Sequence, residues 1–325
     1  MTAKDNTGTK RPLIILTGPT AVGKTALSIG LAKAIQGEII SADSMQVYRG
    51  MDIGTAKITK EQMDGVPHHL IDIMDPSDSF HVMAFQQKCK EAMEDIYARH
   101  KIPILVGGTG FYIQSVLYDI SFTETDTDIE YRQKLQKIAE EQGGYVLHAR
   151  LAKIDPEAAD EIHPNNVKRV IRALEFNHQT GEKISIHNEQ ERQKKSPYQF
   201  RYYVLSLPRE ILYDRINRRV DVMRRDGLVD EVKGLLQQGI TPNMVSMQGL
   251  GYKEIIDALQ GSCSFEEAFE RIKRETRHFA KRQFTWFRRE RDVTWIDKET
   301  YENEDTILQY MIEDLKNAHI LPADQ

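Results

Sequence analysis

Gly18-Pro19-Thr20-Ala21-Val22-Gly23-Lys24-Thr25 is the stretch of sequence that decides the fold. It follows the apolar run Leu13–Leu16 and opens a segment whose apolar residues have helical spacing. A strand, the motif G-x-x-x-x-G-K-[ST] and a helix, in that order, form a P-loop. In a P-loop, backbone N–H groups and the helix dipole bind a phosphate group. Lys24 adds a point charge, and Thr25 adds a hydroxyl suited to Mg²⁺. The motif predicts a site for a diphosphate or triphosphate, which need not belong to a nucleotide.

The composition is that of a soluble globular protein. The chain has 325 residues, of which 40% are hydrophobic and 29% are charged. No stretch is long and apolar enough to cross a bilayer, and the polar segment Met1–Lys10 lacks the apolar core of a signal peptide. Cys89 and Cys263 lie far apart and form no C-x-x-C pair, which predicts neither a disulfide framework nor a structural zinc site. We expect a cytoplasmic protein without a membrane partner, acting as a monomer.

Basic residues gather in two stretches despite the formal net charge of −5. The segment between Glu270 and Asp292 carries nine Lys or Arg residues with aromatic residues between them, and a second basic run spans residues 215–225. Basic residues interleaved with aromatic ones are typical of RNA-binding surfaces. The same pattern also suits a packed helix with a solvated face, so composition leaves both interpretations open.

Further apolar runs predict the remaining strands of the sheet. Glu38–Ser41 and Ile102–Val106 both read as buried strands. In open α/β sheets ligands bind beyond the carboxyl ends of strands, so Asp43 and the turn Gly107–Gly110 are expected beside the P-loop. A P-loop ATPase would usually show an acidic Mg²⁺ ligand at the end of an apolar strand. The sequence has none in that form, which argues against an ATPase.

The composition changes at Ser121. Helical patterns fill residues 128–142, 156–162 and 166–180, and the polar stretch 188–197 is expected to be a linker. Strand character returns at 202–207, which indicates a helical insertion within an α/β domain. We therefore predict an α/β fold: a P-loop NTPase-like parallel sheet core with a helical insertion domain and a helical C-terminal part. The boundaries are 1–120 for the first part of the core, 121–198 for the insertion and 199–325 for the return to the core with its basic helices.

The C-terminal third is predicted to be mostly helical. The expected helices cover residues 209–225, 229–237, 252–259 and 265 to about 286, and a closing helix covers 304–316. A last strand is expected at 294–296.

Several separate blocks of sequence together resemble the bacterial tRNA dimethylallyltransferase family. The resemblance extends from Arg11 to about Trp295, and six blocks in order are far more specific than one motif. They are Gly18–Thr25, Ser41–Tyr48, Met51–Lys57, Val106–Gly110, His163–Glu175 and Gln248–Glu254.

The resemblance implies transfer of a dimethylallyl group from dimethylallyl diphosphate to N6 of the adenine 3′ of the anticodon, position 37 of the tRNA. It implies Mg²⁺ as cofactor, and as partners dimethylallyl diphosphate and the anticodon stem-loop of tRNA. It also implies that the P-loop, Gly18, Pro19, Thr20, Ala21, Val22, Gly23, Lys24 and Thr25, holds the diphosphate of the isoprenoid rather than ATP.

The reaction needs groups of two kinds. Charge develops on the leaving diphosphate, where Lys24, Thr25 with its metal ion, and an arginine would act. By motif position that arginine is Arg219, with Arg218 as the alternative. Adenine N6 is a poor nucleophile that must lose a proton, and Asp43 is placed to accept it. Asp43 could instead cap the following turn or hold Mg²⁺ through water.

Contacts with the tRNA follow from the family's pattern. Each of these residues could instead be a solvated or structural group, and the glycines after Gln248 also fit plain helix punctuation. The predicted contacts are Asp43, Ser44, Met45, Gln46, Thr109, Arg132, Val167, Lys168, Arg169, Val170, Ile171, Gln248, Gly249, Gly251 and Tyr252.

Three other functions compete with this interpretation. An adenylate dimethylallyltransferase would modify free nucleotides, but it would need neither the insertion nor the basic helices. A P-loop kinase of a small metabolite would consume ATP and should show the acidic Mg²⁺ ligand. An RNA-binding module with a decayed P-loop is disfavoured by the intact Gly23-Lys24-Thr25 and by Asp43.

Overall fold

The structure is a computed structural model that describes residues 10–122 and 128–322. Residues 1–9 lie outside the described part, and they make up most of the polar segment Met1–Lys10 discussed above. The chain divides into two compact units, one formed by the residues up to Leu117 together with those from Pro197, and the other by Tyr118–Ser196. We call them the core unit and the helical unit and describe each by itself.

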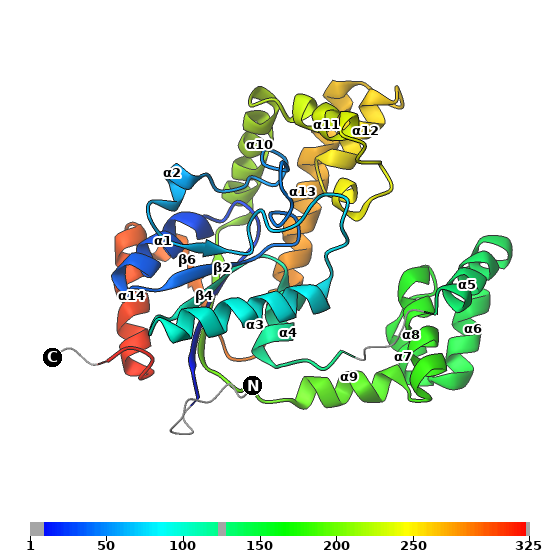
Figure 1. The fold of residues 1–325 in the computed structure, drawn as a ribbon, viewed down its shortest axis with the longest axis horizontal. Helices are drawn as coiled ribbons and strands as arrows, with labels where there is room; N and C mark the ends of the chain where they lie inside the picture. The colour runs from blue at the N-terminus through cyan, green and yellow to red at the C-terminus, as the bar shows by residue number, and fades with distance from the viewer. Residues whose placement is uncertain (1–9, 123–127, 323–325) are drawn as a thin grey trace. The chain divides into compact units, whose positions relative to one another are not determined.

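A six-stranded sheet in the order β3-β2-β4-β1-β5-β6 forms the centre of the core unit (Figure 1). Every neighbouring pair is parallel, so all the strands end at one edge of the sheet. The central strand β1 is fully buried from Leu13 to Leu16, because a parallel sheet is covered on both faces. The strands are β1 Pro12–Thr17, β2 Glu38–Ala42, β3 His68–His69, β4 Pro103–Gly107, β5 Gln199–Ser206 and β6 Val293–Asp297.

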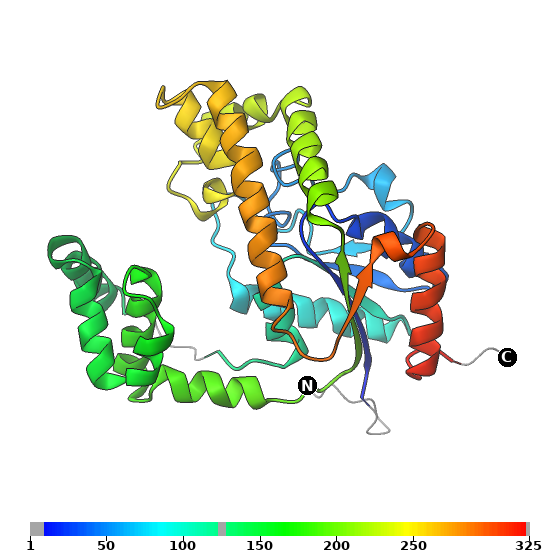
Figure 2. The same cartoon turned by 180° about the vertical axis from the view of Figure 1, so that it is seen from behind.

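Helices cover the sheet and extend beyond its carboxyl edge. Ile14 and Leu16 of β1 belong to one apolar cluster with Leu27 and Leu31 of α1 and Met311 of α14. Figures 1 and 2 show α10, α11, α12 and the first part of α13 gathered where the strands end. The helices are α1 Lys24–Ala34, α2 Lys60–Met63, α3 Val82–Ala98, α4 Gly110–Leu117, α10 Arg209–Arg225, α11 Leu228–Gln237, α12 Tyr252–Leu259, α13 Phe265–Phe287 and α14 Glu304–Asn317, with short 3-10 helices at Val245–Gln248 and Lys298–Thr300.

The helical unit has its own apolar core. Leu147, Leu151, Val170 and Leu174 are at most 2% exposed and pack together. Its helices are α5 Ile129–Gln142, α6 Gly144–Ile154, α7 Pro156–Glu161, α8 Val167–Thr180 and α9 Ile184–Gln193.

The α/β fold with a parallel sheet is confirmed, but one element prediction was wrong. The polar stretch 188–197 is not all linker, because α9 runs to Gln193. The helix is anchored at its start: buried Asp155 accepts hydrogen bonds from the Ser185 N–H at 3.0 Å and from the Ser185 hydroxyl at 2.7 Å. Among the helices of the described ranges, none combines the length and apolar character needed to span a membrane.

Candidate active site

The P-loop joins β1 to α1 at the carboxyl edge of the sheet. Gly23 is the residue before the helix and has φ 99°, a left-handed conformation that favours glycine. A Cβ at this position would also lie 2.7 Å from Lys298 Nζ. Because glycine offers no side-chain cap, the first N–H groups of α1 keep their capacity to bind an anion.

Lys24 lies against the loop that it follows. Its Nζ donates hydrogen bonds to the carbonyl oxygens of Gly18 at 3.0 Å and Pro19 at 2.9 Å. Burial and, to a smaller extent, the positive charge of Arg219 lower the pKa of Lys24 to about 7, and the carboxylate of Asp43 opposes this shift. Arg219 of α10 and Asp43 after β2 are thus both close enough to Lys24 of α1 for their charges to affect its pKa.

The structure separates Arg219 from Arg218. Arg218 has a 78% exposed side chain that pairs with Asp214 at 2.8 Å, one turn earlier on α10. The positive charge of Arg219 lowers the pKa of Lys24, and the surrounding protein lowers the pKa of the Arg219 guanidinium, although the residue as a whole is exposed. Because Arg219 and not Arg218 affects the pKa of Lys24, Arg219 is the arginine on the P-loop side of α10.

Asp43 has one oxygen fixed by the backbone. Its Oδ1 accepts hydrogen bonds from the N–H groups of Met45 at 2.8 Å and Gln46 at 3.3 Å, so the side chain does cap the following turn. Within residues 10–122 and 128–322, no hydrogen bond to Oδ2 is found. Capping and proton acceptance are therefore compatible, because the turn orients the carboxylate through one oxygen and leaves the other for a ligand.

Gln283 of α13 connects the two loops of the site, and sequence reasoning missed it. Its Oε1 accepts the Thr20 N–H at 2.9 Å, and its Nε2 donates to the Gly108 carbonyl at 3.0 Å. The prediction that the Thr20 N–H binds the diphosphate needs correction, because this donor is already engaged. The one signal in the sequence is an amide at helical spacing between Ala280 and Phe287, both of which are fully buried.

The glycine loop after β4 is packed against the same helix. The Thr109 N–H donates to the Ala42 carbonyl at 3.3 Å, which holds the loop beside the end of β2. A Cβ on Gly108 would collide with Gln283 Nε2, and one on Gly110 would collide with the indole of Trp286. The Thr109 side chain, a predicted tRNA contact, is partly exposed at this edge.

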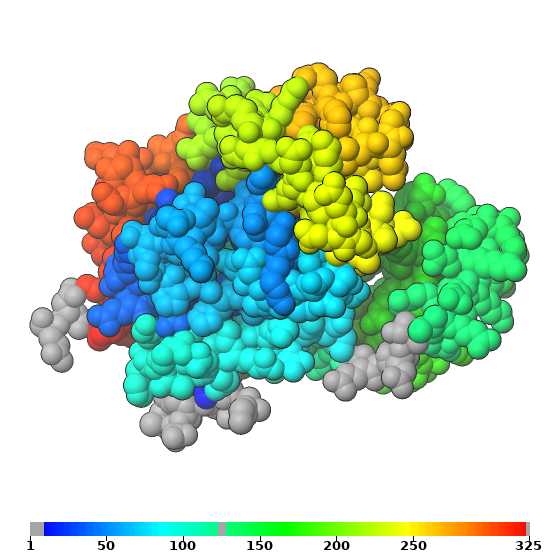
Figure 3. Space-filling model, turned by 45° about the horizontal axis from the view of Figure 1, so that its top comes forward, coloured from blue at the N-terminus to red at the C-terminus, as the bar shows by residue number. Residues whose placement is uncertain are grey.

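Two predicted tRNA-binding segments of the core unit lie side by side. A Cβ on Gly249 would be 2.5 Å from Met45 Cε, and the surface around residues 240–250 borders that of the segment near residue 50 (Figure 3). Gln46 Nε2 donates to the Thr55 carbonyl at 3.3 Å, which ties it to the next loop. Partly exposed side chains from both segments, Ser44, Met45 and Gln46 among them, thus form one surface.

Glu231 organises that loop from α11, and sequence reasoning missed it as well. Its carboxylate accepts three backbone N–H groups, from Asp52 at 2.9 Å, Ile53 at 2.7 Å and Gly54 at 3.1 Å. The fourth donor is the Tyr252 hydroxyl at 2.7 Å. Tyr252 is fully buried, so its prediction as a tRNA contact is wrong. Its hydroxyl instead binds the carboxylate that holds the loop.

The helical unit divides its predicted tRNA contacts into core and surface residues. Val170 is fully buried and Ile171 is 7% exposed, so these two pack the unit and cannot present side chains to RNA. Arg132 is held by Glu175, with Nε to Oε1 at 2.6 Å and Nη2 to Oε2 at 2.9 Å. Lys168 and Arg169 are exposed at the start of α8, and Val167 is half-buried beside them.

The residues present suit Mg²⁺ held partly by its substrate. The described residues contain no group of three His, Cys, Asp or Glu side chains that could cage a metal ion. Thr25 is exposed in the first turn of α1, and Asp43 follows the end of β2 at the same edge of the sheet. Mg²⁺ commonly binds through one carboxylate, substrate phosphates and water, which matches this sparse donor set.

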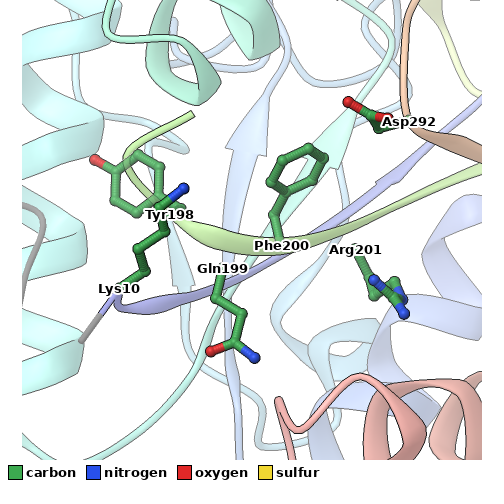
Figure 4. Close-up of a pocket in the computed structure, with 6 residues that line it drawn as sticks. All are labelled: Lys10, Tyr198, Gln199, Phe200, Arg201 and Asp292. Atoms are coloured by element: carbon green, nitrogen blue, oxygen red, sulfur yellow. The ribbon is translucent and has the colours of Figure 1, made fainter. Parts of the chain in front are cut away.

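A separate hollow of about 530 Å³ lies at the opposite, amino-terminal edge of the sheet. Figure 4 shows its lining side chains along the start of β5, where the strands begin. Ligands of open α/β sheets bind at the carboxyl edge, so this hollow is not the active site. Its lining residues are Lys10, Tyr198, Gln199, Phe200, Arg201 and Asp292.

Comparison with known proteins identifies the family. A family model described as IPP transferase matches residues 46–290. The tRNA dimethylallyltransferase of Lachnoclostridium phytofermentans is 57% identical over 96% of this chain and 99% of its own length. The crystal structure of the tRNA isopentenylpyrophosphate transferase of Bacillus halodurans is similar with a TM-score of 0.70 and 47% identity, covering 95% of this chain and 98% of that one. A eukaryotic dimethylallyltransferase acting on tRNA is similar with a TM-score of 0.79 and 31% identity, over 97% of this chain and 81% of that one. The chain therefore belongs to the IPP transferase family, whose relatives named here are tRNA dimethylallyltransferases.

Proposed function

We propose that this protein transfers the dimethylallyl group of dimethylallyl diphosphate to N6 of adenine 37, beside the anticodon of tRNA, and releases diphosphate. The observation that carries the proposal is the convergence of Lys24, Arg219 and Asp43 from three elements at one edge of the sheet. Two cations suit the leaving group and one carboxylate suits the nucleophile, so the site holds both halves of an alkyl transfer.

The leaving diphosphate is stabilised by positive groups already in place. When the C1–O bond of the allylic substrate breaks, its electron pair moves onto the diphosphate. Lys24, Arg219 and the first N–H groups of α1 would interact with that charge. Because these groups are fixed before reaction, they need little rearrangement as the charge develops.

Asp43 acts on the nucleophile. As N6 forms its bond to C1, the amino group becomes acidic, and Asp43 Oδ2 would accept the released proton. The N–H groups of Met45 and Gln46 hold Oδ1, so the carboxylate keeps its orientation while it does so.

The metal ion would be held by Thr25, by water and by the substrate phosphates, with Asp43 as the nearby carboxylate. When bound, Mg²⁺ would neutralise part of the charge that appears on the diphosphate.

The tRNA is recognised by two surfaces. A base inside a folded loop must leave its stack before N6 can reach Asp43. Ser44, Met45 and Gln46, with the adjoining turn Gln248–Gly251, would receive the flipped adenine. Lys168 and Arg169 of the helical unit would contact phosphates of the anticodon stem.

The test is transfer of radiolabel from dimethylallyl diphosphate in the presence of Mg²⁺. An anticodon stem-loop RNA and AMP are offered in parallel, with Arg219→Ala as the diagnostic variant and Arg218→Ala as its matched control. We expect label on the RNA alone, with the KM for dimethylallyl diphosphate raised by Arg219→Ala and unchanged by Arg218→Ala. Label on AMP would assign the protein to the free-nucleotide class, and ATP hydrolysis without label transfer would assign it to the kinases.

A further inference from the structure

A pocket of about 650 Å³ lies between the start of α10, the last turns of α13 and strand β6. Three of the side chains that line it are aromatic, Tyr213, Phe284 and Trp295, and three are cationic, Arg209, Lys281 and Arg288. Its volume falls within the range of sites that bind small molecules or single groups of larger ones. None of the functions assigned so far uses it.

The pocket and the active site lie on different faces of α13. Gln283 and Trp286 point to the loops of the active site, as their contacts with Gly108 and Gly110 show. Lys281, Phe284 and Arg288 follow the spacing i, i+3, i+7. Since successive residues of a helix turn by about 100°, this second set lies roughly opposite the first.

The distance along α10 supports the same separation. Arg209 lines the pocket at the beginning of the helix, whereas Arg219 faces the P-loop lysine ten residues later. At 1.5 Å per residue the two positions are about 15 Å apart along the helix axis.

The charge of the pocket is unbalanced. No carboxylate lines it, and within the described part of the chain Arg209, Lys281 and Arg288 form no ion pair. The Arg209 guanidinium lies over the Tyr213 ring, 5.0 Å from its centroid. Three unpaired cations around one hollow are complementary to an anionic ligand.

The aromatic side chains add a flat apolar surface. The rings of Phe284 and Trp295 are nearly parallel, with 9° between their planes and 6.2 Å between their centroids. Trp295 lies on the edge strand β6 and remains 39% exposed, so part of its indole is open to a ligand. A partly exposed indole beside cations is the combination on which unpaired bases stack while their phosphates are neutralised.

We propose that this pocket binds a nucleotide, with the base against Trp295 and the phosphate among Arg209, Lys281 and Arg288. The nucleotide can be a free mononucleotide or one residue of a single-stranded RNA, because both offer the same base and phosphate. The pocket is independent of the proposed transfer reaction, since a chain without transferase activity would still bind nucleotides there.

Tryptophan fluorescence tests the proposal on the full chain. The sequence has two tryptophans, so a Trp286→Phe variant leaves Trp295 as the single reporter and makes binding at the Asp43 site silent. AMP, adenosine and a single-stranded oligoadenylate are titrated in turn. We expect saturable quenching by AMP or the oligonucleotide, at least tenfold weaker binding of adenosine, and a dissociation constant raised at least tenfold by Lys281→Ala with Arg288→Ala. Arg289→Ala, an exposed neighbour outside the pocket, is the matched control and should leave the constant unchanged.

Each outcome decides the proposal. Quenching by AMP identifies a free-nucleotide site, and quenching by the oligonucleotide alone identifies an RNA subsite. Absence of quenching by both, or equal weakening by Arg289→Ala, would overturn the site. Displacement of the nucleotide by dimethylallyl diphosphate would also overturn it, since the pocket would then serve the isoprenoid.

If Trp286→Phe fails to fold, calorimetry on the chain with both tryptophans replaces fluorescence. AMP and the oligonucleotide are titrated into it, and Arg288→Ala is again compared with Arg289→Ala. Label transfer to the stem-loop, measured separately, shows whether the transferase proposal stands.

Discussion

Asp43 combines two tasks in one side chain. Its Oδ1 caps the turn that carries Met45 and Gln46, while its Oδ2 is available to a ligand. Capping residues and catalytic carboxylates have the same residue type, so the sequence alone could not choose between the two roles. The structure shows that the capping bonds orient the carboxylate and do not exclude catalysis.

Asp43→Asn separates these roles. The amide oxygen of asparagine can still accept the two N–H groups, so the turn survives, whereas the amide cannot accept a proton. We expect kcat to fall by about 10²- to 10⁴-fold, with RNA affinity unchanged. Single-turnover label transfer and RNA binding by filter retention measure the two quantities. Asp43→Ala, which loses both roles, is the comparison, and parallel loss of RNA affinity and activity in Asp43→Asn would show that Asp43 is structural.

Lys24 gives the site a pH dependence. Its pKa is about 7 in the folded protein and 10.5 in the reference state, so the unfolded chain binds more protons between these values. The Lys24 contribution to the free energy of unfolding therefore rises with pH across that interval.

Diphosphate binding should reverse this shift, because an anion favours the charged ammonium. At pH 8 we expect dimethylallyl diphosphate to bind with uptake of up to one proton by Lys24, and at pH 6 with little uptake, since Lys24 is then already charged. Calorimetry in buffers of different ionisation enthalpy measures the proton number. Lys24→Arg stays charged throughout and is the control, and equal proton uptake by both proteins at pH 8 would refute the assignment.

At the scale of elements, periodicity predicted most of the fold. Long strands and amphipathic helices such as β1, β5, α10 and α13 have strong patterns, and the structure confirms them close to the expected bounds. Several elements were not predicted, among them α2, β3, α6 and α9. Strand β3 has only two residues, which is too short for a periodic pattern. Helix α9 has no buried residue, so it lacks an apolar period, and it is anchored through Ser185 to Asp155.

The site residues that follow strand ends were predictable from the sequence. Those contributed by helices far away in the sequence were not. Asp43 follows β2 and the P-loop follows β1, on either side of β4 in one parallel sheet, so their common edge follows from topology. Gln283 and Glu231 come from α13 and α11, whose packing on the loops depends on tertiary contacts that no local pattern contains.

Gln283 should matter through position. Gln283→Leu keeps the size of the side chain but leaves the Thr20 N–H and the Gly108 carbonyl without partners, which loosens the P-loop against the glycine loop. We expect kcat/KM to fall by about ten- to a hundredfold, and Gln283→Glu, which retains the acceptor for Thr20, to recover part of it. Steady-state kinetics with each substrate varied gives the values. Equal losses in the two variants, with a matching drop in melting temperature, would indicate a purely structural residue.

At the scale of the whole molecule, the helical unit is a separately packed body within the chain. Its core residues, Val170 among them, explain why only part of the predicted RNA-binding block is at the surface. The exposed cations Lys168 and Arg169 are the part that remains for RNA.

Replacing both cations should weaken RNA binding without affecting the chemistry. For Lys168→Ala with Arg169→Ala we expect the KM for the stem-loop to rise about tenfold, kcat to stay within twofold, and the slope of log affinity against log salt to become shallower by about 2. Lys153→Ala, an exposed cation on α6 of the same unit, is the matched control. An unchanged KM in the double variant would remove this unit from the proposed interface.

The most direct test of the central claim is nucleoside mass spectrometry of an anticodon stem-loop after reaction with this protein, dimethylallyl diphosphate and Mg²⁺. The proposed function predicts one dimethylallyl group on N6 of adenine 37, none on the other adenines, and none when Asp43→Asn replaces the wild-type protein. A stem-loop recovered unmodified, or modified at adenines regardless of position, would contradict it.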